Sequence, residues 1–398
     1  MAHQALLLAA ATGGSQVLVA VLYLLAARGV TPSEFGSTVA GIALGTAAAG
    51  FIDFGTNNHW TRELARGTLA LDEFNGRLLS KIVIALLAAA VWCGATLLLV
   101  PGSLIWIAGP IAVALVANQA CQVQLRSAAR GDLVALVIVA DRVFASVIFF
   151  VLLAVSVSTP TALWISLSVG SIGAAILGRR LSQHGGRTAR VRFRFPWRGA
   201  HYFGLTVVAT SSQALDLTLL SSVAGSAAAG VYGAVSRWTQ PMSLLAAAFS
   251  SALAPYAARS ADLRATWLEV RRAIWMPAAA IVLALAVFFA APAVVDLLLG
   301  GSYSGSAAVL QVLALVVIPS IICQPLVVVL QAMHRDRFVA VVMLIAALGQ
   351  LTLVAVLARG AGALGAATAA LVAQLFIFIA LGVGVFRLRA RQSSGVPK

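Results

Sequence analysis

Apolar stretches long enough to cross a membrane follow one another along almost the whole chain, separated by short polar breaks. A helix rises 1.5 Å per residue, so about 20 apolar residues cover roughly 30 Å of hydrocarbon. A mean hydropathy of +0.99, with only 10% charged residues, excludes a soluble domain. We therefore predict an all-α polytopic membrane protein with about twelve transmembrane helices. The predicted spans are residues 5–27, 36–57, 80–100, 104–122, 133–155, 161–178, 202–224, 227–252, 274–299, 306–331, 338–358 and 362–386.

The basic residues give the direction of insertion, because short cytoplasmic loops retain Lys and Arg. With both termini placed in the cytoplasm, the inner loops and the tail hold 23 of the 27 basic residues, Arg77 and Lys81 among them. The outer loops hold only Arg28 and Arg359. This spread over every inner loop also explains the formal net charge of +15, so we expect no nucleic acid as a partner.

The longest polar break, residues 179–201, is rich in Arg and contains no acidic residue. We interpret it as a basic cytoplasmic linker that attracts anionic lipid headgroups. A shift of 197 positions aligns Phe35-Gly36 with Tyr232-Gly233, and each half has six spans, so both halves enter the membrane from the same side. We expect two parallel six-helix bundles around a central cavity. The expected domains are an N-terminal bundle (1–178), the linker (179–201), a C-terminal bundle (202–386) and a cytoplasmic tail (387–398).

The charged residues that we single out within the predicted spans are Asp53, Asp141, Arg142, Asp216 and Arg237. A charge at bilayer depth costs at least about 2.5 kcal/mol, so such a residue should face a partner or a wet cavity. Arg142 and Arg237 fall near the midplane, one in each half, and guanidinium groups suit the phosphate of an anionic substrate. The alternative is that the pairs Asp141–Arg142 and Asp216–Arg237 only lock helices together. Asp53, near an inner helix end, is expected to be solvated by snorkelling or by neighbouring amides.

Two glutamines extend the candidate site. Gln213 precedes Asp216 by three residues and shares its helix face, and the repeat equates Gln16 with Gln213. The three cysteines lack metal-ligand spacing, and no cofactor or metal is expected. Gly41 and Gly45 predict close helix packing within a bundle. The substrate-binding candidates are Arg142, Arg237, Gln16, Gln213 and Asp216, and the ion-coupling candidates are Asp141, Asp216 and Asp53.

Two segments resemble the bacterial polysaccharide exporter and O-antigen flippase family of the multidrug, oligosaccharidyl-lipid and polysaccharide transporter superfamily. The first, residues 31–66, begins with Glu34-Phe35-Gly36, continues to Asp53-Phe54-Gly55 and ends at Arg62–Arg66. The second, residues 202–260, contains Leu-Asp, Gly-x-Tyr and a late Ala-x-x-Pro. Together they cover about a quarter of the chain.

The resemblance implies a V-shaped pair of six-helix bundles that flips undecaprenyl-diphosphate-linked oligosaccharides between leaflets. It implies a multi-pass protein of the bacterial cytoplasmic membrane, with a lipid-linked anionic glycan and membrane lipids as partners, together with glycan polymerase or ligase machinery. A drug or cation antiporter of the same fold is the alternative, with Asp141 and Asp216 as proton or sodium sites. A membrane enzyme is disfavoured, because the outer loops are short and no constellation for acid–base catalysis is evident.

Overall fold

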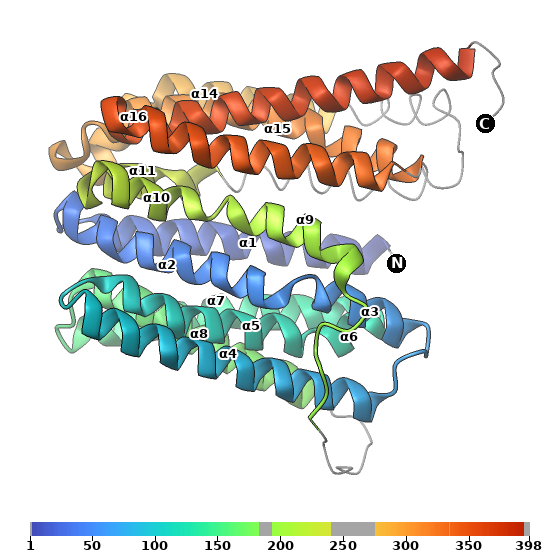
Figure 1. Cartoon of the computed structure of the whole chain (residues 1–398). Coiled ribbons are helices and arrows are strands. Elements are labelled where there is room, and N and C mark those ends of the chain that lie inside the picture. The colour runs from blue at the N-terminus through green and yellow to red at the C-terminus, as the bar shows by residue number, and fades with distance from the viewer. Residues whose placement is uncertain (1, 183–192, 240–274, 334, 394–398) are drawn as a thin grey trace. The chain divides into compact units, whose positions relative to one another are not determined.

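The computed structural model describes residues 2–182, 193–239, 275–333 and 335–393, and within these ranges the chain is helical without strands (Figure 1). The helices of the first part are α1 (Ala2–Ala27), α2 (Pro32–Asp53), α3 (Thr56–Ala65), α4 (Leu71–Leu99), η1 (Leu104–Ile107), α5 (Ala108–Cys121), α6 (Val123–Ser127), α7 (Gly131–Ala154) and α8 (Thr159–Ser182). They are followed by α9 (His201–Ser212), α10 (Leu215–Ala224), α11 (Ser226–Ser236), η2 (Arg237–Thr239), α14 (Trp275–Leu299), η3 (Gly301–Tyr303), α15 (Ser306–Ala332) and α16 (Asp336–Ser393).

Within the described residues each predicted span overlaps a helix, which confirms the all-α membrane class. In the described residues, ten helices are long and apolar enough to cross a membrane. One of them, α16, covers the last two predicted spans, and its backbone breaks between them at Gly362 (φ 53°, ψ −130°). The predicted span 227–252 begins as α11, and its remainder from residue 240 lies outside the described residues.

The chain separates into two compact units, unit 1 (residues 1–234) and unit 2 (residues 235–398). In unit 1, α7 packs between α1 and α8, while α2 contacts α5, α9 and α10. In unit 2, α15 packs against both α14 and α16. The predicted division into two six-helix bundles around a cavity stays a prediction.

The family-like motifs of the first segment mark the two ends of α2. Thr31 caps the helix start in a capping box with Glu34, each side chain receiving the other residue's backbone N–H, and Pro32 occupies the first turn. At the other end Phe54 (φ 43°) and Gly55 (φ 77°) adopt left-handed conformations, which stop α2 and turn the chain into α3. The motif residues thus set the length of α2.

Glycines allow α2 to approach its neighbours at backbone distance. Gly41 and Gly45 face η1 and α5, where added Cβ atoms would lie 2.6 Å from Ile107 and 2.8 Å from the Ala108 carbonyl, and this confirms the predicted packing within a bundle. An added Cβ at Gly36 would lie 1.7 Å from the carbonyl oxygen of Ser226, at the start of α11.

The α11 side of that second contact is equally close. A Cβ at Gly230 would lie 1.8 Å from the carbonyl oxygen of Pro32. Beside it, the hydroxyl groups of Ser33 and Ser226 share a hydrogen bond of 2.7 Å. We call this meeting of the first turns of α2 and α11 the α2–α11 contact.

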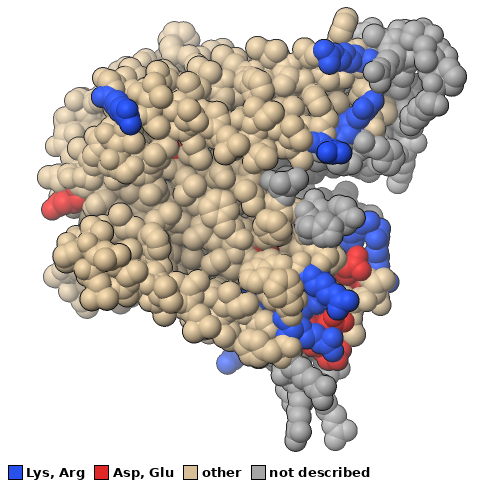
Figure 2. All heavy atoms as spheres, viewed as in Figure 1, with Lys and Arg blue, Asp and Glu red and all other residues tan. Residues whose placement is uncertain are grey.

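Most of the visible Lys and Arg side chains gather at one edge of each unit, a few charged side chains lie elsewhere, and residues other than Lys, Arg, Asp and Glu cover the rest of the visible described surface (Figure 2). In unit 1 the basic edge comprises α3, the first turns of α4, the end of α6 and the end of α8. In unit 2 the corresponding residues are Arg335, Arg337 and Arg387, while Arg359 lies near the break of α16. The exposed faces of α4 and α7 carry large apolar side chains such as Leu98 and Val147, as expected of helices that face lipid.

Candidate functional site

A buried carboxylate, Asp141, joins three helices near the middle of unit 1. Its Oδ1 accepts a hydrogen bond of 3.0 Å from the Ser171 hydroxyl on α8. Its Oδ2 accepts one of 3.1 Å from the Asn118 amide on α5 and lies 3.3 Å from Nη2 of Arg142 on α7. Each of its oxygens therefore has a donor, which is what a carboxylate at this depth requires. We call these four residues the Asp141 cluster.

A ladder of polar side chains connects the Asp141 cluster to the basic edge. The Gln122 side-chain amide donates to Oδ1 of Asn118 at 2.9 Å, and the Arg126 guanidinium donates to Oε1 of Gln122 at 3.0 Å. The three residues are spaced by four, so they share one face of the α5–α6 segment. Two amides of the sequence "NQACQVQLR", Asn118 and Gln122, thus bond to each other, and Asn118 also bonds to α7. Their positions along the chain alone could not reveal the partner on α7.

Arg142 lies at the border of this buried network. The side chain of Asp141 is 7% exposed and that of Arg142 is 21% exposed. Consecutive helical residues leave the axis about 100° apart, so the two can pair only by leaning toward each other. Arg142 makes that contact with one nitrogen, and a guanidinium carries five N–H donors. The remaining donors are the chemically useful part of the cluster.

Gln16 lies at nearly the same depth on a helix that packs against α7. The C-terminal ends of α1 and α7 lie at the same edge of unit 1. The Thr159 hydroxyl, in the first turn of the helix that follows α7, donates to the Ala26 carbonyl near the end of α1 at 3.1 Å. Gln16 is 11 residues before the end of α1, and Arg142 is 12 residues before the end of α7. Both side chains are half-buried.

Asp216 and Gln213 occupy a break between α9 and α10. The helix is interrupted at Gln213-Ala214, and Asp216 accepts hydrogen bonds from its neighbour's backbone N–H and from the Tyr232 hydroxyl, the latter at 3.0 Å. Arg237 begins η2 in the other unit. Its pairing with Asp216 therefore stays a prediction, as do the substrate-binding roles of both residues.

Asp53 requires a correction. It is buried, not solvated, and its Oδ1 accepts from Nζ of Lys81 at 2.5 Å and from the Thr56 hydroxyl at 2.8 Å. Lys81 is fully buried on α4, although the sequence placed it among inner-loop residues. Its ammonium also donates to the Asn57 side chain at 3.1 Å and lies 5.0 Å from the ring centroid of Trp60.

The sequence puts Lys81 at the very start of the predicted span 80–100, next to the inner loop, whereas α4 already begins at Leu71. Lys81 therefore lies almost three turns into the helix, opposite the α2–α3 corner. The ion-coupling role assigned to Asp53 stays a prediction, but any such role must act on a carboxylate that already holds an ammonium. Among the described residues, no group of three His, Cys, Asp or Glu side chains could hold a metal ion.

The basic linker contributes to this same edge. In its described part, the Trp197 indole donates to the Ile52 carbonyl at 2.8 Å, and the Arg194 backbone N–H donates to the Ser80 hydroxyl at 3.0 Å. The Arg198 carbonyl accepts from Arg77, whose burial corrects its expected place in an inner loop. The segment 193–200 therefore packs against the C-terminal end of α2 and the N-terminal turns of α4.

Comparisons with known proteins concern the fold alone. No protein-family model and no curated protein sequence matches the chain. Among solved structures, the lipid II flippase MurJ in an inward closed conformation is similar, with a TM-score of 0.75, 14% identity, and coverage of 96% of this chain and 87% of that one.

Two MOP superfamily transporters match over a similar length. An inward-facing multidrug resistance MATE transporter of the MOP superfamily gives a TM-score of 0.70 at 13% identity, covering 96% of both chains. A MOP superfamily transporter from Pyrococcus furiosus gives a TM-score of 0.59 at 14% identity, covering 97% of this chain and 96% of that one. All three cover more than four fifths of both chains. The chain therefore shares the fold of these solved membrane proteins.

Proposed function

We propose that this protein is a flippase that moves a polyprenyl-diphosphate-linked oligosaccharide, or a related polysaccharide precursor, from the inner to the outer leaflet by alternating access. The bacterial cytoplasmic membrane is its proposed location, with both termini in the cytoplasm. The fold supports a membrane transporter of the MOP type, and the substrate is inferred from the charge chemistry of unit 1.

The observation that carries the proposal is the asymmetry between Asp141 and Arg142. Ser171 and Asn118 donate hydrogen bonds to the two carboxylate oxygens of Asp141. The carboxylate therefore neutralises the charge of Arg142 without occupying all of the guanidinium N–H donors. The guanidinium is the more exposed partner, and among the side chains that the structure describes it pairs with Asp141 alone, at 3.3 Å. A diphosphate offers several anionic oxygens, and planar guanidinium groups bind such oxygens through paired hydrogen bonds.

The remaining site residues have supporting roles in this proposal. Arg237 is the second proposed cation for the diphosphate. Gln16, Gln213 and Asp216 provide hydrogen bonds to the first sugar. The proposed partners are the lipid-linked anionic glycan, membrane lipids and the polymerase or ligase machinery that would use the translocated glycan.

The test is flipping of a polyprenyl diphosphate that carries a fluorescent sugar, in vesicles that contain the purified protein. A membrane-impermeant quencher then reports the fraction of probe in the outer leaflet over time. A charge-assisted hydrogen bond contributes about 1.5–3 kcal/mol, so Arg142→Gln should slow flipping about tenfold or more. Arg142→Lys should retain part of the rate, and Arg359→Gln, which lies near the break of α16, serves as the matched control.

Stability must be separated from transport in this experiment, because Arg142→Gln leaves the Asp141 carboxylate without its cation. The double variant Asp141→Asn/Arg142→Gln removes both charges and should unfold at the wild-type temperature. If that variant flips the probe at the wild-type rate, Arg142 is not part of the substrate site. We also expect Arg237→Ala to abolish flipping without loss of protein from the membrane.

A proton- or sodium-coupled drug antiporter is the second candidate, and the Asp141 cluster is what favours it. There, a carboxylate and a hydroxyl oxygen from α7 and α8 converge at 3.0 Å, as in an oxygen-ligand site for a proton or a small cation. In vesicles with an imposed pH or sodium gradient, this candidate predicts exchange of a cationic dye. Dye exchange with the lipid-linked probe left unmoved would overturn the flippase proposal.

A further inference from the structure

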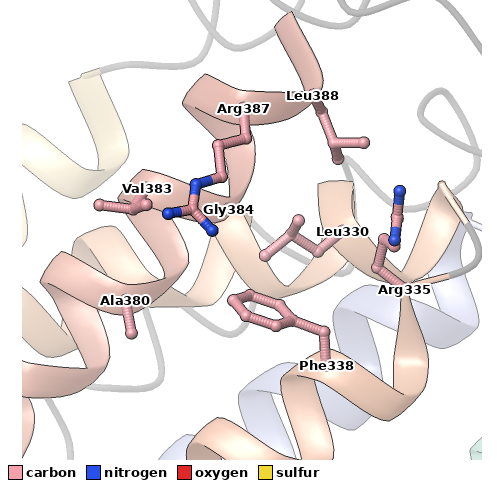
Figure 3. A pocket seen from close by; sticks show the side chains of 8 residues that line it. All are labelled: Leu330, Arg335, Phe338, Ala380, Val383, Gly384, Arg387 and Leu388. Atoms are coloured by element: carbon pink, nitrogen blue, oxygen red, sulfur yellow. The ribbon is translucent and has the colours of Figure 1, made fainter. Parts of the chain in front are cut away.

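A pocket in unit 2 combines two arginines with an apolar wall. Neither the flippase function nor the antiporter function proposed above uses this pocket. Its volume is about 400 Å³. It lies where the end of α15, the start of α16 and the end of α16 come together, and Figure 3 shows the side chains that line it. The lining includes Arg335, Arg387, Leu330, Phe338, Val383 and Leu388.

The wall of the pocket is a built surface. The Phe338 ring lies against the backbone of Gly384, where an added Cβ would be 2.8 Å from the ring. Leu330 beneath it is buried and belongs to a core cluster with Leu381 and Val339. Phe338 and Val383 are themselves exposed, which suits side chains that face hydrocarbon.

The two cations are exposed and uncompensated by described side chains. Arg335 and Arg387 are both exposed, and neither forms an ion pair with a side chain that the structure describes. Within residues 275–393 the acidic residues are Asp296, near the far end of α14, and Asp336, beside Arg335. Arg337, which is exposed, adds further positive charge to the same edge.

We infer that this pocket binds one anionic phospholipid from the leaflet at the basic edge. The headgroup phosphate lies between Arg335 and Arg387, and an acyl chain follows Phe338 and Val383 toward the hydrocarbon. Basic pockets between transmembrane helices on the cytoplasmic side are suited to anionic headgroups. A free phosphate would gain nothing from the apolar wall, whereas a phospholipid gains from both parts. The inference does not depend on which substrate the protein moves.

The experiment titrates the purified full-length protein with phosphatidylglycerol and counts bound lipids by native mass spectrometry. Phosphatidylcholine provides the neutral comparison. Each basic residue near a membrane surface contributes about 1 kcal/mol, so Arg335→Gln/Arg387→Gln should weaken phosphatidylglycerol binding about thirtyfold. Arg337→Gln is the matched control, because Arg337 is an exposed arginine of the same edge that does not line the pocket. Arg335→Lys/Arg387→Lys should restore most of the affinity.

The results separate cleanly. Loss of one bound phosphatidylglycerol in the Gln double variant, with Arg337→Gln unchanged, supports the site. If the double variant and the wild type bind phosphatidylglycerol equally, the inference is overturned. It is also overturned if the wild type binds phosphatidylcholine as tightly as phosphatidylglycerol. Displacement of the bound lipid by millimolar inorganic phosphate would also overturn it, because the apolar wall would then contribute nothing.

Discussion

Under the alternating access that we propose, the α2–α11 contact should hold the two helix ends together in only one of the protein's states. The substitution Gly230→Ala places a Cβ 1.8 Å from the Pro32 carbonyl oxygen. Observed Cβ contacts are essentially never below 3.0 Å, so the backbones must separate by more than an ångström. Overpacking that forces a backbone shift costs about 1–3 kcal/mol, which changes an equilibrium about 5- to 150-fold. We expect Gly230→Ala to favour the state in which these ends are apart.

Cysteine cross-linking measures this population. The Ser33 and Ser226 hydroxyl groups are 2.7 Å apart, so Ser33→Cys/Ser226→Cys should oxidise rapidly to a disulfide in a background without the native Cys93, Cys121 and Cys323. Adding Gly230→Ala should slow the oxidation by the factor above.

The control for this measurement is Gly14→Ala, because no heavy atom lies within 4 Å of the position where its Cβ would stand. Its cross-linking rate should equal that of the background protein. Helix content and thermal unfolding report whether the Gly230→Ala variant is folded. A folded Gly230→Ala variant that cross-links as fast as the background would refute the argument, since the contact would then have room that the structure does not show.

Three further substitutions test the buried polar groups of unit 1. Lys81→Met leaves the Asp53 carboxylate buried without its cation and should cost about 3–5 kcal/mol of stability, seen as a lower unfolding temperature in detergent; adding Asp53→Asn should recover most of it. Ser171→Ala removes a donor from Asp141 and should cost about 1–3 kcal/mol in the same assay, against little change if that hydrogen bond is not formed. Burial lowers the pKa of His59 below 6.5, so the unfolded chain takes up the proton more readily. Stability should then fall as the pH drops below about 6.5, and His59→Gln should reduce that dependence in melts recorded across pH; an unchanged slope would contradict the assignment.

The spans could be predicted because the bilayer fixes their length, and any apolar stretch of that length has one structural solution. The partners of buried polar groups could not. Lys81 lies near the end of an apolar stretch, where snorkelling explains a lysine as well as burial does. Only the earlier start of α4 turns it toward Asp53, and the polar run that follows Asp53 was the available signal.

The Asp141 cluster illustrates the same limit. Periodicity places Asp141 and Arg142 on different faces of one helix, but it does not say which other helices face them. Asn118 and Ser171 come from helices on either side in the sequence, and only packing brings them to Asp141. The break at Gln213 has neither Gly nor Pro beside it, so the sequence gives no local sign that α9 ends there.

The glycine face of α2 has a consequence for biosynthesis. Besides the α2–α11 contact, Gly50 lies against Ser211, and Gly55, just after α2, lies against Phe203. Unlike Gly41 and Gly45, which η1 and α5 cover, these glycines are covered by residues made 148 or more positions later. At translation speeds of about 5–20 residues per second, the interval is of the order of ten seconds. During that time the nascent chain carries a bare strip of backbone within the bilayer. The membrane insertion machinery must therefore tolerate, or shield, an N-terminal unit that cannot close until its seventh span arrives.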